Sequence, residues 1–187
     1  GAFGANNQPV GVLIAAAATN NLVGVNATGD ANFISGNQGH GIEIRGLGTN
    51  SNTLVGNVVG LAGDIITAVS NTGYGILVHD QAAQNNIGNP VQGQASVVAA
   101  NILGNIAITE QATQNQVLNN IIGFSPINGA TYSSTQGSGV LIDNANSNTI
   151  GDPTGSFVNF IRGHQVAGIR VQNGATLNRL QGNSIVA

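Results

Sequence analysis

The chain has 187 residues, of which 41% are hydrophobic, 4% aromatic and 6% charged, and its formal net charge is −3. It contains 27 Asn and 28 Gly but no Cys, Met, Trp or Lys. The lack of Cys excludes disulfides, thiol catalysis and zinc–thiolate sites, and only four Arg residues argue against nucleic acid as a partner. No apolar run approaches the roughly 20 residues of a membrane-spanning helix, so we expect no membrane span.

A short apolar strand recurs along the chain, beginning with Gly11-Val-Leu-Ile and Gly41-Ile-Glu-Ile. The later copies begin at Gly75, Asn105, Gly139 and Gly168. The spacings of 30, 34, 30, 34 and 29 residues describe two alternating units with a super-period of 64 or 63 residues. Alternating apolar residues bounded by Gly and Asn predict strands rather than helices, and a repeat of this length predicts a solenoid.

Each unit contains a second and a third strand, and a recurring Asn precedes each of them. The Asn residues before the second strand are Asn20, Asn52, Asn85, Asn115, Asn148 and Asn178. Those before the third strand are Asn32, Asn57, Asn101, Asn120, Asn159 and Asn183. The two positions are five residues apart in one unit type and 11 to 16 in the other, which predicts inserted loops at two different corners.

Three short strands per unit, without helices, predict an all-β fold: a three-sided parallel β-solenoid of about six coils spanning residues 1–187 as one domain. At a coil rise of about 4.8 Å, inward residues such as Val12, Ile42 and Ile76 would stack into apolar columns. We place Phe33 and Phe160 at recurring core positions as well. Asn at a corner tolerates the left-handed conformation and can bond along the stack, so the twelve Asn positions are predicted to form two structural ladders.

The segments Asn148-Thr-Ile-Gly, Asn32-Phe-Ile-Ser-Gly-Asn and Asn52-Thr-Leu-Val-Gly-Asn-Val-Val-Gly resemble right-handed parallel β-helix repeat proteins of the pectate-lyase-like superfold. These are typically large secreted or surface-anchored bacterial proteins. The resemblance covers essentially the whole chain, and it implies right-handed coils and an extracellular or cell-surface location. The superfold hosts polysaccharide lyases, hydrolases, adhesins and passive stalks, so the resemblance does not indicate one activity.

Gly39-His40-Gly41 resembles the Gly-His-Gly element of polygalacturonases. Those enzymes also need an Asn-Thr-Asp element, an Asp-Asp pair and an Arg-x-Lys substrate clamp. This chain has no two adjacent acidic residues and no Lys. We therefore interpret His40 as an ordinary repeat position and predict no enzymatic activity and no cofactor.

Asp80, Glu110 and Asp143 follow the first strand on three consecutive coils. Side chains on neighbouring coils lie about 5 Å apart, close enough for carboxylates to share Ca²⁺. The favoured interpretation is a solvated acidic patch, and the alternative is a weak calcium site.

Leu13, Leu77 and Leu141 point outward from the first strand of every second coil. Two interpretations are open. Either the long insert of the same unit folds over each Leu, or the three form a lateral contact strip for another solenoid or a surface.

The composition and the repeat predict a non-enzymatic structural module of an extracellular bacterial fibre, filament or cell-surface protein. Because both end coils would expose unpaired backbone and apolar core, we expect a longer chain or end-to-end association of copies. The alternatives are a polysaccharide-binding or polysaccharide-cleaving β-helix, which needs converging carboxylates and aromatic platforms, and a surface adhesin that binds through its inserted loops.

Overall fold

The computed structural model describes residues 8–24, 31–90, 94–132 and 137–186. These residues form three parallel sheets of six strands each, and they contain no helix. The first sheet contains β1 (Val10–Ile14), β4 (His40–Arg45), β7 (Tyr74–His79), β10 (Gly104–Thr109), β13 (Val140–Asp143) and β16 (Ile169–Gln172). The second contains β2 (Leu22–Gly24), β5 (Thr53–Val55), β8 (Asn86–Ile87), β11 (Gln116–Val117), β14 (Thr149–Ile150) and β17 (Arg179–Leu180). The third contains β3 (Phe33–Ile34), β6 (Val58–Val59), β9 (Ser96–Val98), β12 (Asn120–Ile122), β15 (Asn159–Arg162) and β18 (Asn183–Val186).

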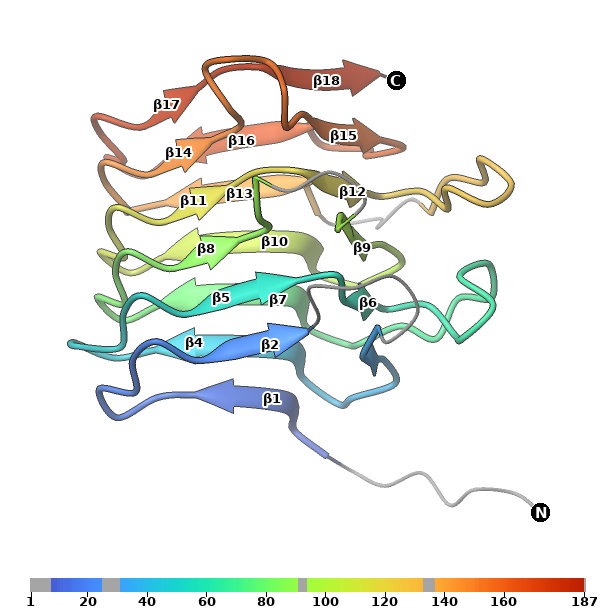
Figure 1. Cartoon of the computed structure of the whole chain (residues 1–187), viewed down its shortest axis with the longest axis horizontal. Helices are drawn as coiled ribbons and strands as arrows, with labels where there is room; N and C mark the ends of the chain where they lie inside the picture. Colours follow the sequence, from blue (N-terminus) through green and yellow to red (C-terminus); the bar gives the residue numbers. More distant parts are fainter. Residues whose placement is uncertain (1–7, 25–30, 91–93, 133–136, 187) are drawn as a thin grey trace.

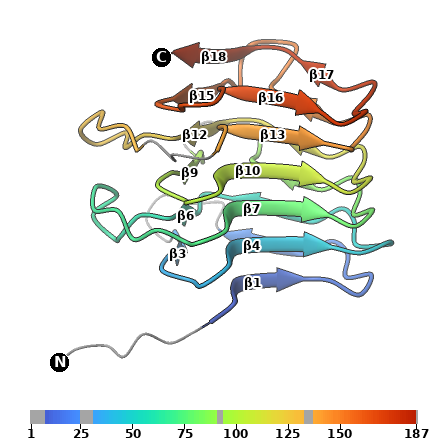
Figure 2. The same cartoon turned by 180° about the vertical axis from the view of Figure 1, so that it is seen from behind.

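Three consecutive strands make one coil, so coil 1 is β1–β3 and coil 6 is β16–β18. The coils rise in sequence order from β1 to β18, and every neighbouring pair of strands is parallel. Views from opposite sides show that the path is right-handed (Figures 1 and 2). The predicted three-sided parallel β-solenoid is confirmed.

The apolar core is a set of columns that run through the coils. Ile42, Ile76 and Ile106 are adjacent in register, and each is fully buried. Their column continues to Val12 at one end and through Val140 to Ile169 at the other. Each sheet contributes one layer of inward side chains to the core. This narrow space suits branched aliphatic residues, which explains the low aromatic content.

The ladder before the second strand is confirmed in five of its six members. It runs Asn21–Asn52–Asn85–Asn115–Asn148–Asn178, with amide-to-amide distances of 2.9 to 3.2 Å. The prediction of Asn20 was wrong by one residue. Asn20 has a φ of 59° and donates to the Thr19 hydroxyl, and it belongs to the left-handed position that precedes each rung.

The ladder before the third strand contains Asn32, Asn57, Asn120, Asn159 and Asn183. The assignment of Asn101 to this ladder was wrong, because Ser96 is in register with Asn120 and its hydroxyl accepts from the Asn57 N–H. The insert before Ser96 differs in length from those of the other units, so this alignment was not evident from the sequence.

A third ladder, which the sequence did not predict, lies just before the first sheet. Asn37 donates to Asn71 at 2.7 Å, Asn71 to Asn101 at 2.8 Å, and Asn101 to Asn105 at 3.1 Å. Asn105 in turn lies 2.9 Å from Nε2 of His164. The Gly that begins most first strands makes room for this ladder: a Cβ on Gly41 would lie 2.9 Å from the Asn71 amide nitrogen.

The inserts after β6 and β12 fold against the outside of the third sheet. Antiparallel bridges join Leu61 to Ala68 and Phe124 to Thr131, and both arms project from the same edge of the solenoid (Figures 1 and 2). The first arm helps to bury Val58 and Val97, which point outward and form a small apolar cluster separate from the main core.

The prediction that Phe33 and Phe160 lie in the core was wrong. Both point outward from the third sheet and are 49% and 44% exposed, while the neighbouring Ile34 and Ile161 are buried. The sequence-based assignment of inward and outward residues was therefore reversed at these two positions.

Candidate functional site

The ionisable side chains gather on the outer face of the first sheet and on the turn that follows it. Eight of the fourteen Asp, Glu, Arg and His residues of the chain lie there: His40, Glu43, Arg45, His79, Asp80, Glu110, Asp143 and Arg170. This concentration arises because β4, β7, β10, β13 and β16 each bring an outward polar residue to the same face. The chain has few ionisable residues, and most of them are concentrated on this one face.

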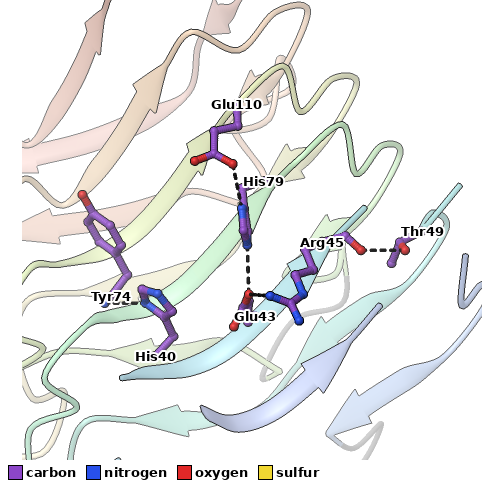
Figure 3. A network of polar contacts seen from close by, with 7 residues as sticks. All are labelled: His40, Glu43, Arg45, Thr49, Tyr74, His79 and Glu110. Atoms are coloured by element: carbon purple, nitrogen blue, oxygen red, sulfur yellow. Dashed lines mark hydrogen bonds and ion pairs between the residues drawn. The ribbon is translucent and has the colours of Figure 1, made fainter. Parts of the chain in front are cut away.

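His79 lies between two carboxylates on neighbouring coils (Figure 3). Its Nε2 is 3.0 Å from Oε1 of Glu43, and its Nδ1 is 3.0 Å from Oε2 of Glu110. Glu43 is only 6% exposed and also pairs with Arg45 at 3.3 Å, so this buried carboxylate contacts both Arg45 and His79.

The three predicted calcium ligands are engaged elsewhere or lie apart. Glu110 faces His79, and Asp143 accepts from the side-chain amides of Gln172 at 2.7 Å and Asn173 at 2.8 Å. Asp80 lies in the turn with a φ of 51°. In the described ranges, no group of three or more His, Asp or Glu residues is placed to hold a metal ion.

An open depression with a volume of about 450 Å³ lies on this face, over coil 4. Its lining comes from four consecutive coils and consists of His40, Tyr74, Leu77, Thr109, Glu110, Asp143 and Asn144. Figure 3 shows the Tyr74 ring beside His40, with Glu110 and His79 on the neighbouring part of the same face.

The depression lies where coil 4 carries residues smaller than Tyr74 and Leu77 on coil 3. Gly104 is in register with Tyr74, and Ala107 lies between Leu77 and Leu141. A Cβ on Gly104 would lie 3.3 Å from Cδ1 and Cε1 of Tyr74, so the tyrosine ring leans over the glycine. Gly104 and Ala107 are themselves buried, and the surface is low over coil 4.

His40 fixes the base of Tyr74. The two rings stack with their centroids 5.9 Å apart and an interplanar angle of 9°, and Nδ1 of His40 accepts the Tyr74 backbone N–H at 3.0 Å. Burial lowers the pKa of His40, the nearby Glu43 opposes this, and His79 adds to it. The resulting neutral ring suits its role as an acceptor.

Asp143 influences the other end of Tyr74. Burial raises the pKa of the Tyr74 hydroxyl, the negative charge of Asp143 raises it further, and Arg170 opposes both effects. Tyr74 and Asp143 line the same depression from coils 3 and 5.

The three outward leucines do not form a uniform strip. Leu13 is 50% exposed, Leu77 is 8% exposed beside the depression, and Leu141 is half-buried. The inserts that the first interpretation invokes lie between the second and third strands of coils 1, 3 and 5, and two of them include residues 25–30 and 91–93, which are outside the described residues. Both interpretations therefore stay predictions.

Sequence reasoning did not place Tyr74 at a site, and it named Leu77 only as part of a contact strip with Leu13 and Leu141. The usable signal was Ala107, which interrupts the column between Leu77 and Leu141, together with Gly104 beside Tyr74.

No family model, no curated protein and no solved structure matches this chain. The described segments contain no helix that is long and apolar enough to cross a membrane. The three stacked parallel sheets nevertheless give the chain the architecture of a parallel β-helix repeat protein.

Proposed function

We propose that this chain is a non-enzymatic structural module of an extracellular bacterial fibre, filament or cell-surface protein. The observation that carries this proposal is the continuity of its bonding along the axis. Three polar ladders and several apolar columns pass from coil to coil. Such a stack maintains length and stiffness with few charges, which makes it insensitive to the salt of its surroundings.

Coil 6 supports the further proposal that the stack continues into another coil, from the same polypeptide or from a second copy. Its inward residues Val171, Leu180 and Ile185 are 42%, 48% and 53% exposed, whereas their counterparts on coil 5 are fully buried. Parallel strands with an unpaired edge and an open apolar face readily pair with further strands.

Self-association is tested by sedimentation velocity over a range of concentrations. We expect end-to-end oligomers whose population falls in Ile185→Glu, because a charge on the open apolar face opposes stacking. Ser184→Glu is the matched control, since Ser184 is in register with the outward Phe160. A chain that stays monomeric at every concentration, or a control that dissociates equally, contradicts stacking between copies.

The absence of enzymatic activity is a separate part of the proposal. We expect no turnover of polygalacturonate with or without Ca²⁺. Turnover that disappears in Asp80→Ala would overturn it.

A second candidate function is polysaccharide binding, and the depression over coil 4 favours it. This depression combines an aromatic ring with two carboxylates and two further polar side chains on one open face. A stalk that also binds a surface polysaccharide would combine the two functions.

A further inference from the structure

We propose that the depression over coil 4 binds a sugar residue that carries a free amino group. The proposal deepens the second candidate function and rests on it. It follows from three properties of the site: an aromatic platform, two carboxylates in the lining, and a low surface where coil 4 carries two small residues.

Tyr74 provides the platform. Its ring is held on one side by the stack with His40 and leans over Gly104. Leu77 adds an apolar wall, and it is 8% exposed. One face of a pyranose ring consists of C–H groups with partial positive charge, which pack against the electron-rich face of an aromatic ring.

The charge of the lining selects the substituent. Glu110 and Asp143 contribute two carboxylates, and Thr109 and Asn144 contribute neutral polar groups. Glu110 already contacts the His79 ring at 3.0 Å. The hydrogen-bond donors on Asp143 are neutral amides, so its charge is solvated but not cancelled there. An ammonium group would form charge-assisted bonds with these carboxylates and would also be attracted to the Tyr74 ring, whereas a uronate would be repelled.

The depression is large enough for one sugar unit, and the adjoining units of the polysaccharide would lie outside it. The volume of about 450 Å³ falls within the range of about 300–1,000 Å³ typical of small-molecule sites. Because the depression is open along the sheet, the chain of a polysaccharide can enter and leave on either side.

Isothermal titration of the whole chain with three disaccharides tests the proposal. The probes are a dimer of glucosamine, its N-acetylated counterpart and digalacturonate, and putrescine reports on charge alone. We expect the glucosamine dimer to bind about tenfold more tightly than the acetylated dimer, the factor that one charge-assisted hydrogen bond supplies. We expect weaker binding of putrescine and none of digalacturonate.

Two variants locate the site. Ala107→Leu fills the low surface over coil 4 with the residue that both neighbouring coils carry, and we expect it to abolish binding while the unfolding transition is retained. Asp143→Asn keeps the side-chain shape and should weaken binding of the glucosamine dimer about tenfold without affecting the acetylated dimer. Asp64→Asn, on the distant arm after β6, is the control for net charge and should bind like the wild type.

The outcomes distinguish a failure of the amino-group assignment from a failure of the proposed polysaccharide binding. Equal binding of both glucosamine dimers, lost in Ala107→Leu, would overturn the amino-group assignment but leave polysaccharide binding in place. Equal binding of putrescine and the glucosamine dimer would overturn the sugar assignment. No saturable binding of any saccharide, or binding unchanged in Ala107→Leu and Asp143→Asn, would overturn both.

Discussion

The buried Asn115 side chain uses its full hydrogen-bonding capacity. Asn115 donates to the Ala82 carbonyl and to Asn148 Oδ1, both at 3.1 Å. Its own Oδ1 accepts from the backbone N–H and the side-chain amide of Asn85. Two donors and two acceptor sites are thus satisfied at 1% exposure. Neither a carboxylate, which cannot donate, nor a hydroxyl, which donates once, can replace all four bonds.

We expect Asn115→Ala to lower the free energy of unfolding by about 3 kcal/mol, because it removes four buried hydrogen bonds and takes away the acceptor of the Asn85 backbone N–H. Asn86→Ala is the matched control, since this half-buried neighbour is the first residue of β8 and outside the ladder. The control should cost less than about 1 kcal/mol. Urea denaturation measures both, and equal losses would show that the ladder adds no stability.

His164 makes stability depend on pH. Burial lowers its pKa to about 4, below the ordinary value of 6.5. Between these two values the unfolded chain binds more protons than the folded chain, so stability is complete above about pH 6.5 and falls as the pH drops toward 4. With allowance for its partial exposure, the loss is about 2 kcal/mol.

His164→Asn should remove most of this slope. The other rungs of the third ladder show that an amide fits the position, and Asn does not titrate. Urea denaturation at pH 7 and pH 4.5 would show similar stability of both proteins at pH 7 and a smaller loss in the variant at pH 4.5. Parallel profiles would assign the slope to other groups, such as His40, whose pKa burial also lowers.

Within a strand, the side of the sheet to which a residue points determines its burial more than its residue type does. In β15 the large Phe160 points out and is 44% exposed, while Ile161 beside it is fully buried. The outward column of the third sheet is apolar throughout its middle, because the arm after β6 covers Val58 and Val97. Two apolar faces on one sheet remove the alternation that would otherwise identify the inward face.

The two neighbours in β15 therefore provide a direct comparison. Ile161→Ala should destabilise the chain by about 2–5 kcal/mol, since it opens a cavity in the core. Phe160→Ala should cost about 1 kcal/mol or less, although it removes more atoms, because much of the ring already contacts solvent. Thermal or urea unfolding of both variants decides the matter, and a larger loss for Phe160→Ala would place the ring in the core.

At the scale of the whole molecule, the repeat alone predicted the three sheets, the number of coils and most of the two ladders. Regular spacing suffices for these because each coil repeats the register of the one before. Asn20 and Asn101 were misassigned where an adjacent Asn or a variable insert made two alignments equally regular. The depression could not be predicted in this way, since it lies where Gly104 and Ala107 depart from the repeat.

The orientation of the backbone hydrogen bonds has a mechanical consequence. The strands cross the solenoid axis, so the bonds between neighbouring coils lie nearly parallel to it. The interfaces between coils are arranged one after another along the axis. Under tension along the axis, one interface would therefore break at a time, and the coils would detach singly from an end. Each lost coil would release a contour length of about 100 Å for its roughly 30 residues. A rod that resists bending through its stacked amides would therefore yield to stretching in small, regular steps, and so dissipate a sudden pull.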